Sequence, residues 1–79
     1  MAEKNLEERD LTRSEAAEQL RGIADALESE ESFDVIVDNK TIALTPPESV
    51  GYELGVRERS SVLRGSRESV TITMDWSPA

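Results

Sequence analysis

LTRSEAAEQLRGIADALE, residues 11–28, is the stretch of sequence that decides the fold. Its apolar residues recur at spacings of about three to four, which places them on one face of an α-helix. These residues are Ala16, Ala17, Leu20, Ile23, Ala24 and Leu27. Thr12 and Glu15 have the spacing of a capping box, in which each side chain accepts from the other residue's backbone amide. The sequence therefore predicts an amphipathic helix that begins after Thr12 and ends near Glu28.

The segments that follow the helix alternate between apolar and polar residues, as β-strands do. Residues 33–37 and 40–44 flank Asp38-Asn39, which tolerate the positive φ of a two-residue hairpin turn. That turn pairs residue 35 with 42 and residue 33 with 44. A turn one residue later would keep the same residues on the same face. Their shared apolar face carries Phe33, Val35, Ile42 and Leu44.

Two longer strands are predicted over about 49–59 and about 67–76, with a loop over 60–66. Clean alternation gives each strand one polar and one apolar face, which is typical of antiparallel sheets. One parity carries Val50, Tyr52, Leu54 and Val56 on the first strand and Val70, Ile72, Met74 and Trp76 on the second. Residues 5–10 are a candidate for a further, short edge strand.

These elements predict an α+β fold with a single domain over residues 1–79. One amphipathic helix packs on one face of a mainly antiparallel four- to five-stranded sheet, and residues 1–5 form a disordered tail. The aromatic residues Phe33, Tyr52 and Trp76 all have the parity of the helix-facing side. We therefore expect them in the core, although Trp76 could instead stack on a ligand or a partner.

The charge of the chain is strongly negative and low in lysine. Asp and Glu number 17 against 9 Lys and Arg, for a net charge of -8. Such a composition is typical of proteins from salt-in halophiles, in which concentrated salt screens the repulsion and cations form a diffuse atmosphere. An ordinary acidic mesophilic protein is the alternative. Without a membrane-length apolar run or a signal-peptide pattern at residues 1–4, we expect a cytoplasmic protein and no membrane contact.

The order of these motifs resembles the amphi-Trp domain, a small prokaryotic family common in haloarchaea. The resemblance covers about Leu6 to Trp76 and includes the helix, the step Leu44-Thr45-Pro46-Pro47-Glu48-Ser49-Val50 and the last strand Val70-Thr71-Ile72-Thr73-Met74-Asp75-Trp76. In the family, that strand usually alternates acidic and apolar residues before a signature Trp. Here Ser69, Thr71 and Thr73 replace most of the acids. The resemblance implies the fold and a saline habitat, and it brings no activity with it.

The residue inventory excludes several classes of enzyme. The chain has no Cys and no His, which excludes thiolate or imidazole metal sites and Cys-His or Ser-His-Asp catalysis. Its glycines do not form a phosphate-binding loop. Glu28, Glu30, Glu31 and Asp34 lack the spacing of a calcium loop. We therefore expect no catalytic residue, no metal site and no cofactor, and we predict that the protein is not an enzyme.

A basic cluster near the second hairpin loop is the candidate anion-binding site. It consists of Arg57, Arg59, Arg64 and Arg67. Guanidinium groups suit phosphate, but these arginines could also be a solvated surface that offsets the acidic residues. Nucleic acid is an unfavourable partner, because the net charge repels polyanions and the polar sheet face has no aromatic residue for base stacking.

The polar face of the two long strands is the candidate partner interface. It is flat and carries the small residues Gly51, Gly55, Thr71 and Thr73. A plain solvated sheet, with Thr favoured for β-propensity, is the alternative. The leading hypothesis is a non-catalytic interaction or oligomerisation module, a homo-oligomer or a protein-binding domain that uses this sheet face. The alternative hypothesis is an anion- or nucleic-acid-binding module that uses the arginine-bearing hairpin.

Overall fold

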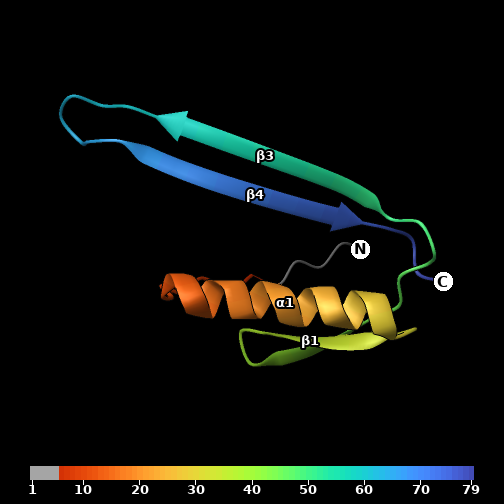
Figure 1. The fold of residues 1–79 in the computed structure, drawn as a ribbon. Helices are drawn as coiled ribbons and strands as arrows, with labels where there is room; N and C mark the ends of the chain where they lie inside the picture. Colours follow the sequence, from red (N-terminus) through yellow and green to blue (C-terminus); the bar gives the residue numbers. More distant parts are fainter. Residues whose placement is uncertain (1–5) are drawn as a thin grey trace. The chain divides into compact units, whose positions relative to one another are not determined.

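The computed structural model describes residues 6–79, so the predicted disordered tail over residues 1–5 lies outside the described residues. The elements in chain order are α1 (Arg13–Ser29), β1 (Phe33–Val37), β2 (Lys40–Leu44), β3 (Gly51–Arg59) and β4 (Arg67–Asp75) (Figure 1). The α+β class is therefore confirmed. The strands form two antiparallel two-stranded sheets, β1-β2 and β3-β4, where the sequence predicted a single four- to five-stranded sheet.

Two local features account for the difference from a single sheet. Pro46 and Pro47 lie between β2 and β3 and have no backbone amide to donate to a ladder. The candidate edge strand over 5–10 is not found either, since residues 6–10 have no strand structure. This segment carries Glu7, Glu8, Arg9 and Asp10 in succession, a composition that strands avoid.

The helix α1 begins as predicted. Thr12 is its N-cap, and the capping box is complete: the Glu15 amide donates to Thr12 Oγ1 at 3.0 Å, and the Thr12 amide donates to Glu15 Oε1 at 2.9 Å. The helix runs one residue beyond the predicted Glu28, and the amide of Glu30 closes its last turn by donating to the Ala26 carbonyl at 3.1 Å.

The β1-β2 hairpin has the predicted turn and register. Asp38 and Asn39 both have positive φ, 47° and 64°, as a two-residue hairpin turn of the primed type requires. Phe33 pairs with Leu44 and Val35 with Ile42. Along β1, burial alternates from residue to residue, so one face of the hairpin is covered and the other is open.

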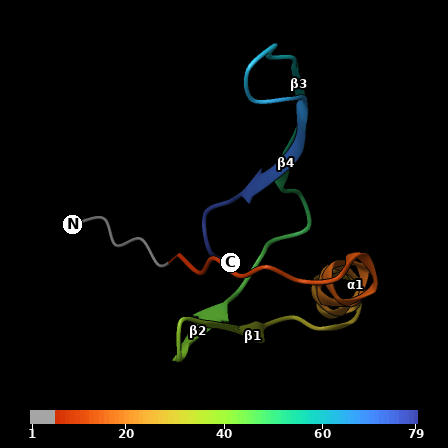
Figure 2. The same cartoon turned by 90° about the vertical axis from the view of Figure 1, so that its left-hand side faces the viewer.

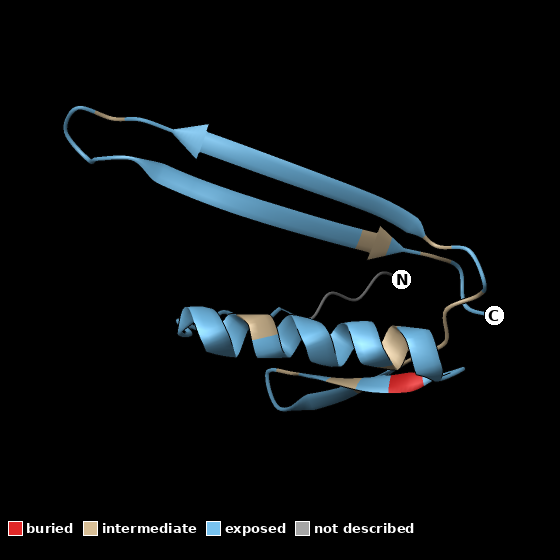
Figure 3. Cartoon of the chain, in the orientation of Figure 1, coloured by how far each residue is buried: buried red, intermediate tan, exposed pale blue. Residues whose placement is uncertain are grey.

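The helix α1 packs beside β1 (Figure 2). Among residues 6–79, Phe33 is the one buried residue, with 7% of its surface exposed (Figure 3). A hollow of about 260 Å³ remains between helix and strand, lined in part by Gly22, Ile23 and Phe33. Phe33 therefore lies in a core that is small and loosely filled.

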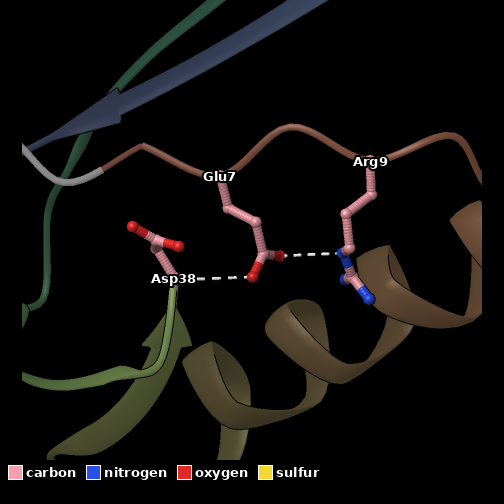
Figure 4. Close-up of polar contacts among 3 residues, drawn as sticks. All are labelled: Glu7, Arg9 and Asp38. Atoms are coloured by element: carbon pink, nitrogen blue, oxygen red, sulfur yellow. Dashed lines mark hydrogen bonds and ion pairs between the residues drawn. The ribbon is translucent and has the colours of Figure 1, made fainter.

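The segment before the helix is tied to the β1-β2 turn by one carboxylate. Glu7 Oε1 accepts a hydrogen bond from the Asp38 amide at 3.2 Å, and Glu7 Oε2 pairs with Arg9 Nε at 3.0 Å (Figure 4). Residues 31 positions apart are thereby connected. This contact gives the charged segment over residues 6–10 a defined position without strand pairing.

The long hairpin β3-β4 belongs to a second compact unit, Pro47–Ser77, separate from the unit that contains α1, β1 and β2. Its strands pair over nine residues each, from Gly51 with Asp75 to Arg59 with Arg67. β3 begins two residues later than predicted, and Trp76 follows β4 directly instead of ending it. Whether the whole chain acts as one domain stays a prediction.

The loop between β3 and β4 is closed by its own backbone. Ser61 and Gly65 exchange amide-to-carbonyl hydrogen bonds of 3.1 and 2.9 Å, and the Ser61 hydroxyl accepts from the Arg64 amide at 3.1 Å. Gly65 has a φ of 77°, a left-handed conformation in which glycine carries no steric penalty. Ser61 thus has a structural role in the turn.

Candidate interaction surface

The small residues predicted as a partner interface lie on one face of the β3-β4 hairpin. Gly55 is directly opposite Thr71, and Thr73 is opposite Glu53. Gly51 is opposite Asp75, whose carboxylate lies where a Cβ on Gly51 would stand. The register therefore brings Gly51, Gly55, Thr71 and Thr73 together, and we call this side of the hairpin the outer face.

Three of the four predicted anion-binding arginines also meet on the outer face. Arg57, Arg59 and Arg67 line a hollow of about 140 Å³ together with Ser69. Arg59 and Arg67 are direct cross-strand neighbours, and like charges in that position destabilise a hairpin. Arg64 does not line this hollow, because it lies in the loop, where its amide is bound by Ser61.

The outer face is consequently polar from end to end. The arginine cluster occupies the loop end, Glu53 and Asp75 occupy the open end, and small uncharged residues lie between them. Sequence reasoning treated the arginines and the small residues separately and missed this arrangement. The signal was present, since the parity of each charged residue along two paired strands places it on a face.

The opposite, apolar face of the same hairpin is exposed as well. Its large side chains keep between 43% and 69% of their surface accessible, and they are Tyr52, Leu54, Val56, Val70 and Ile72. Tyr52, predicted in the core, is 65% exposed, because two strands alone cannot bury either of their faces. Trp76 is half-buried, so its predicted role in the core stays open.

The apolar face ends at a second pair of like charges. Glu58 lies directly opposite Glu68, and both line a hollow of about 440 Å³ beside Val56 and Val70. Near the loop, the hairpin therefore carries a pair of carboxylates on one face and three guanidinium groups on the other. Neither face has its charges balanced within the hairpin.

We also searched the described residues for a metal site and a membrane-spanning helix. Across residues 6–79, no three acidic side chains gather closely enough to hold a metal ion, and the acidic residues after α1 are no exception. Within the same residues, α1 is too short and too polar to cross a bilayer. The β3-β4 hairpin is thus the surface with the most distinctive chemistry.

The combination of a capped amphipathic helix, alternating strands and a Trp directly after the last strand is also the pattern of a known family. The chain matches the Amphi-Trp domain over residues 1–79. It belongs to the Amphi-Trp family. Neither the curated proteins nor the solved structures include a significant match to this chain.

Proposed function

We propose that this Amphi-Trp domain is a non-catalytic interaction module that self-associates through the outer face of the β3-β4 hairpin. The observation that carries the proposal is the charge arrangement of that face, basic at the loop end and acidic at the open end. Two copies related by a two-fold axis, with their hairpins antiparallel, place each basic end against the partner's acidic end. A C₂ contact of this kind is the commonest form of protein self-association.

The distribution of charge along the chain favours the hairpin as the place of contact. Residues 6–46 carry 11 acids and 4 bases, whereas residues 47–77 carry 5 acids and 4 bases. Two copies therefore repel each other least where their second units meet. An isolated two-stranded hairpin is also marginally stable in water, so a further layer or strand from a partner would stabilise it.

Sedimentation equilibrium in about 2 M KCl tests the proposal, because salt at that concentration screens the long-range repulsion between the two copies, whereas charge pairs enclosed in the contact are screened much less. We expect a dimer. The double variant Thr71→Glu/Thr73→Glu should be monomeric, since it introduces unpaired carboxylates into the contact. Thr41→Glu is the matched control, because Thr41 is an exposed strand residue of the other hairpin. A wild-type monomer, or equal loss of dimer in the control, would contradict the proposal.

Anion binding by the arginine cluster is the second candidate function. It is supported by the hollow that Arg57, Arg59 and Arg67 share with Ser69, because a bound anion would relieve the repulsion between Arg59 and Arg67. Calorimetric titration with inorganic phosphate at about 0.1 M KCl tests it. Binding that is lost in Arg59→Gln/Arg67→Gln would support an anion site. For nucleic acid, we expect no measurable affinity at about 1 M KCl, because phosphate contacts weaken steeply with salt.

The wider setting of the module stays a prediction from the sequence. A single four-stranded sheet would require one strand of the β1-β2 hairpin to pair with one strand of the β3-β4 hairpin. A saline cytoplasm is inferred from the excess of acids. A purification of tagged protein at high salt would identify any partner other than a second copy.

A further inference from the structure

We propose that self-association occurs by antiparallel pairing of β4 with β4 of a second copy, centred on Thr71, so that Arg67 faces the partner's Asp75. This inference rests on the proposed self-association, but it places the contact at the free edge of β4, where outer-face residues of the two copies become cross-strand neighbours, instead of between two stacked outer faces. It joins two hairpins edge to edge into one four-stranded sheet across the dimer.

The outer edge of β4 is open to pairing. Within its two-stranded sheet, β4 pairs with β3 on one side, which leaves the backbone groups of the other side without a strand. Natural edge strands are commonly protected by Pro, by Lys, by bulges or by short length. β4 is nine residues long, has no Pro, Lys or Gly, and is uncharged from Ser69 to Met74. It therefore lacks the usual protection against pairing.

One register satisfies both the faces and the charges. Residues directly opposite each other point to the same side of a sheet, so β4 can pair with its copy only in registers that keep outer residues opposite outer residues. Centring on Thr71 pairs all nine residues and places Arg67 opposite the partner's Asp75, twice by symmetry. The remaining opposite pairs are Glu68 with Met74, Ser69 with Thr73, Val70 with Ile72, and Thr71 with itself.

With the exception of Glu68 with Met74, these opposite pairs are favourable combinations. Hydroxyl pairs and β-branched pairs across strands each stabilise a sheet, and unlike charges do so as well. The partner's Asp75 would also reach the arginine cluster, in which Arg67 faces the like-charged Arg59 of its own chain. The intermolecular contact thus supplies the counter-charge that is missing from the hairpin's own register.

The edge of β3 offers a similar but weaker alternative. Centring β3 on Gly55 would place Glu53 opposite the partner's Arg57. That register puts Gly55 against its own copy and leaves Gly51 opposite the partner's Arg59. Glycine weakens strands because it loses more backbone entropy and offers no side chain to pack. The composition of the two edges therefore favours β4.

A charge exchange tests the register. Arg67→Asp and Asp75→Arg should each weaken the dimer about tenfold in about 0.1 M KCl, because each places like charges opposite each other twice. The double variant should recover most of the affinity. Neither single variant should destabilise the hairpin itself. Arg67→Asp removes the repulsion between Arg67 and Arg59, and Asp75→Arg places a positive charge at the same end of the hairpin as Glu53.

The matched control exchanges charges on the other edge. Glu53→Arg, Arg57→Glu and their double variant should show no such recovery, because these residues do not face each other in β4 pairing. If the Glu53→Arg/Arg57→Glu double variant recovers dimer affinity and the Arg67→Asp/Asp75→Arg double variant does not, the inference is overturned and the dimer pairs through β3. A third outcome is a wild-type dimer that Thr71→Glu/Thr73→Glu dissociates, with no recovery of dimer affinity in either double charge-exchange variant. This outcome would overturn the register and leave the proposed function intact.

Disulfide formation gives an independent measurement. The chain has no Cys, and in this register Thr71 is the β4 residue that lies opposite its own copy. Opposite Cα atoms in an antiparallel pair are about 4.5–5.5 Å apart, within the range of a disulfide. Thr71→Cys should therefore cross-link readily on mild oxidation. Thr73→Cys alone should cross-link far more slowly. A mixture of Thr73→Cys and Ser69→Cys chains should cross-link readily, because these two residues lie opposite each other in this register. Equal rates for the two single variants would overturn the inference.

Discussion

The two hairpins of this Amphi-Trp domain are built by the same alternation but differ in what covers them. β1-β2 has five-residue strands, a tight turn at Asp38-Asn39 and a contact between β1 and α1. β3-β4 has nine-residue strands, a longer loop closed at Gly65, and exposed residues along almost its whole length. The short hairpin buries Phe33, whereas the long one leaves Tyr52 65% exposed.

This difference shows that alternation predicts which residues share a face but not whether that face is covered. Burial requires a second layer, and the layer over β1 comes from the neighbouring helix. The long hairpin instead has charges that its own register leaves unbalanced, with Arg59 opposite Arg67 and Glu58 opposite Glu68. Within its own unit, Pro47–Ser77, the long hairpin has no second layer.

Replacing one aromatic in each hairpin should give the largest contrast. Phe33→Ala removes the most buried side chain of residues 6–79 and should cost about 3–5 kcal/mol. Tyr52→Ala should cost less than about 1 kcal/mol, because Tyr52 is exposed and has only its strand neighbours to contact. Urea unfolding of both variants, followed by helix circular dichroism, measures the difference. Equal losses would mean that the two hairpins are equally covered in solution.

Trp76→Ala should have an intermediate effect. Trp76 is half-buried directly after β4, so its loss should cost about 2 kcal/mol, below the value for a fully buried aromatic. As the sole Trp, it also reports on the environment at the open end of the long hairpin. We expect native fluorescence that shifts to the red on unfolding. A native spectrum already at the solvent-exposed position, with an unchanged stability in the variant, would place Trp76 on the surface.

Sequence alone predicts the local structure of this chain well. The capping box at Thr12, the turn at Asp38-Asn39 and the pairing of Phe33 with Leu44 all follow from neighbouring residues. Local rules suffice here because caps and two-residue turns depend on side chains within a few positions of each other.

Sequence did not predict how the strands would be grouped. Alternation is identical for a strand in the middle of a sheet and for one in an isolated hairpin, so it could not show that β2 and β3 belong to different sheets. It also grouped Arg64 with the other arginines, since closeness in sequence does not distinguish the loop from the strand face. The opposite charges at the two ends of the outer face could have been derived from the sequence, because the predicted strands and the loop over 60–66 already place Arg59 opposite Arg67.

Salt should act unequally on the two hairpins. Residues 6–46 carry 11 of the 17 acids, and residues 47–77 are nearly balanced. In the monomeric variant Thr71→Glu/Thr73→Glu, in which dimer formation cannot protect the β4 amides, raising KCl from about 0.1 M to about 2 M should therefore slow amide exchange mainly in α1 and β1-β2, because screening relieves repulsion where the acids are dense. Hydrogen exchange followed by mass spectrometry resolves the two regions. A uniform change, or none, would contradict the argument from charge density.

The smallest expected effect concerns acid and the start of α1. Hydrogen bonds from the Thr12 backbone amide and the Thr12 side chain hold the pKa of Glu15 below its ordinary value of 4.5. Since the folded pKa is lower than the unfolded one, the charged carboxylate stabilises the helix above the unfolded value, and this contribution is lost as the pH falls through the folded value. Glu15→Gln keeps a capping-box acceptor but cannot titrate. Between about pH 6 and pH 3, the variant should lose less helix stability than the wild type. Glu18→Gln is the control, because it removes one charge from the same helix but lies after the cap. Its loss of helix stability with pH should equal that of the wild type. Equal losses in the two variants would show that the capping box does not carry the effect.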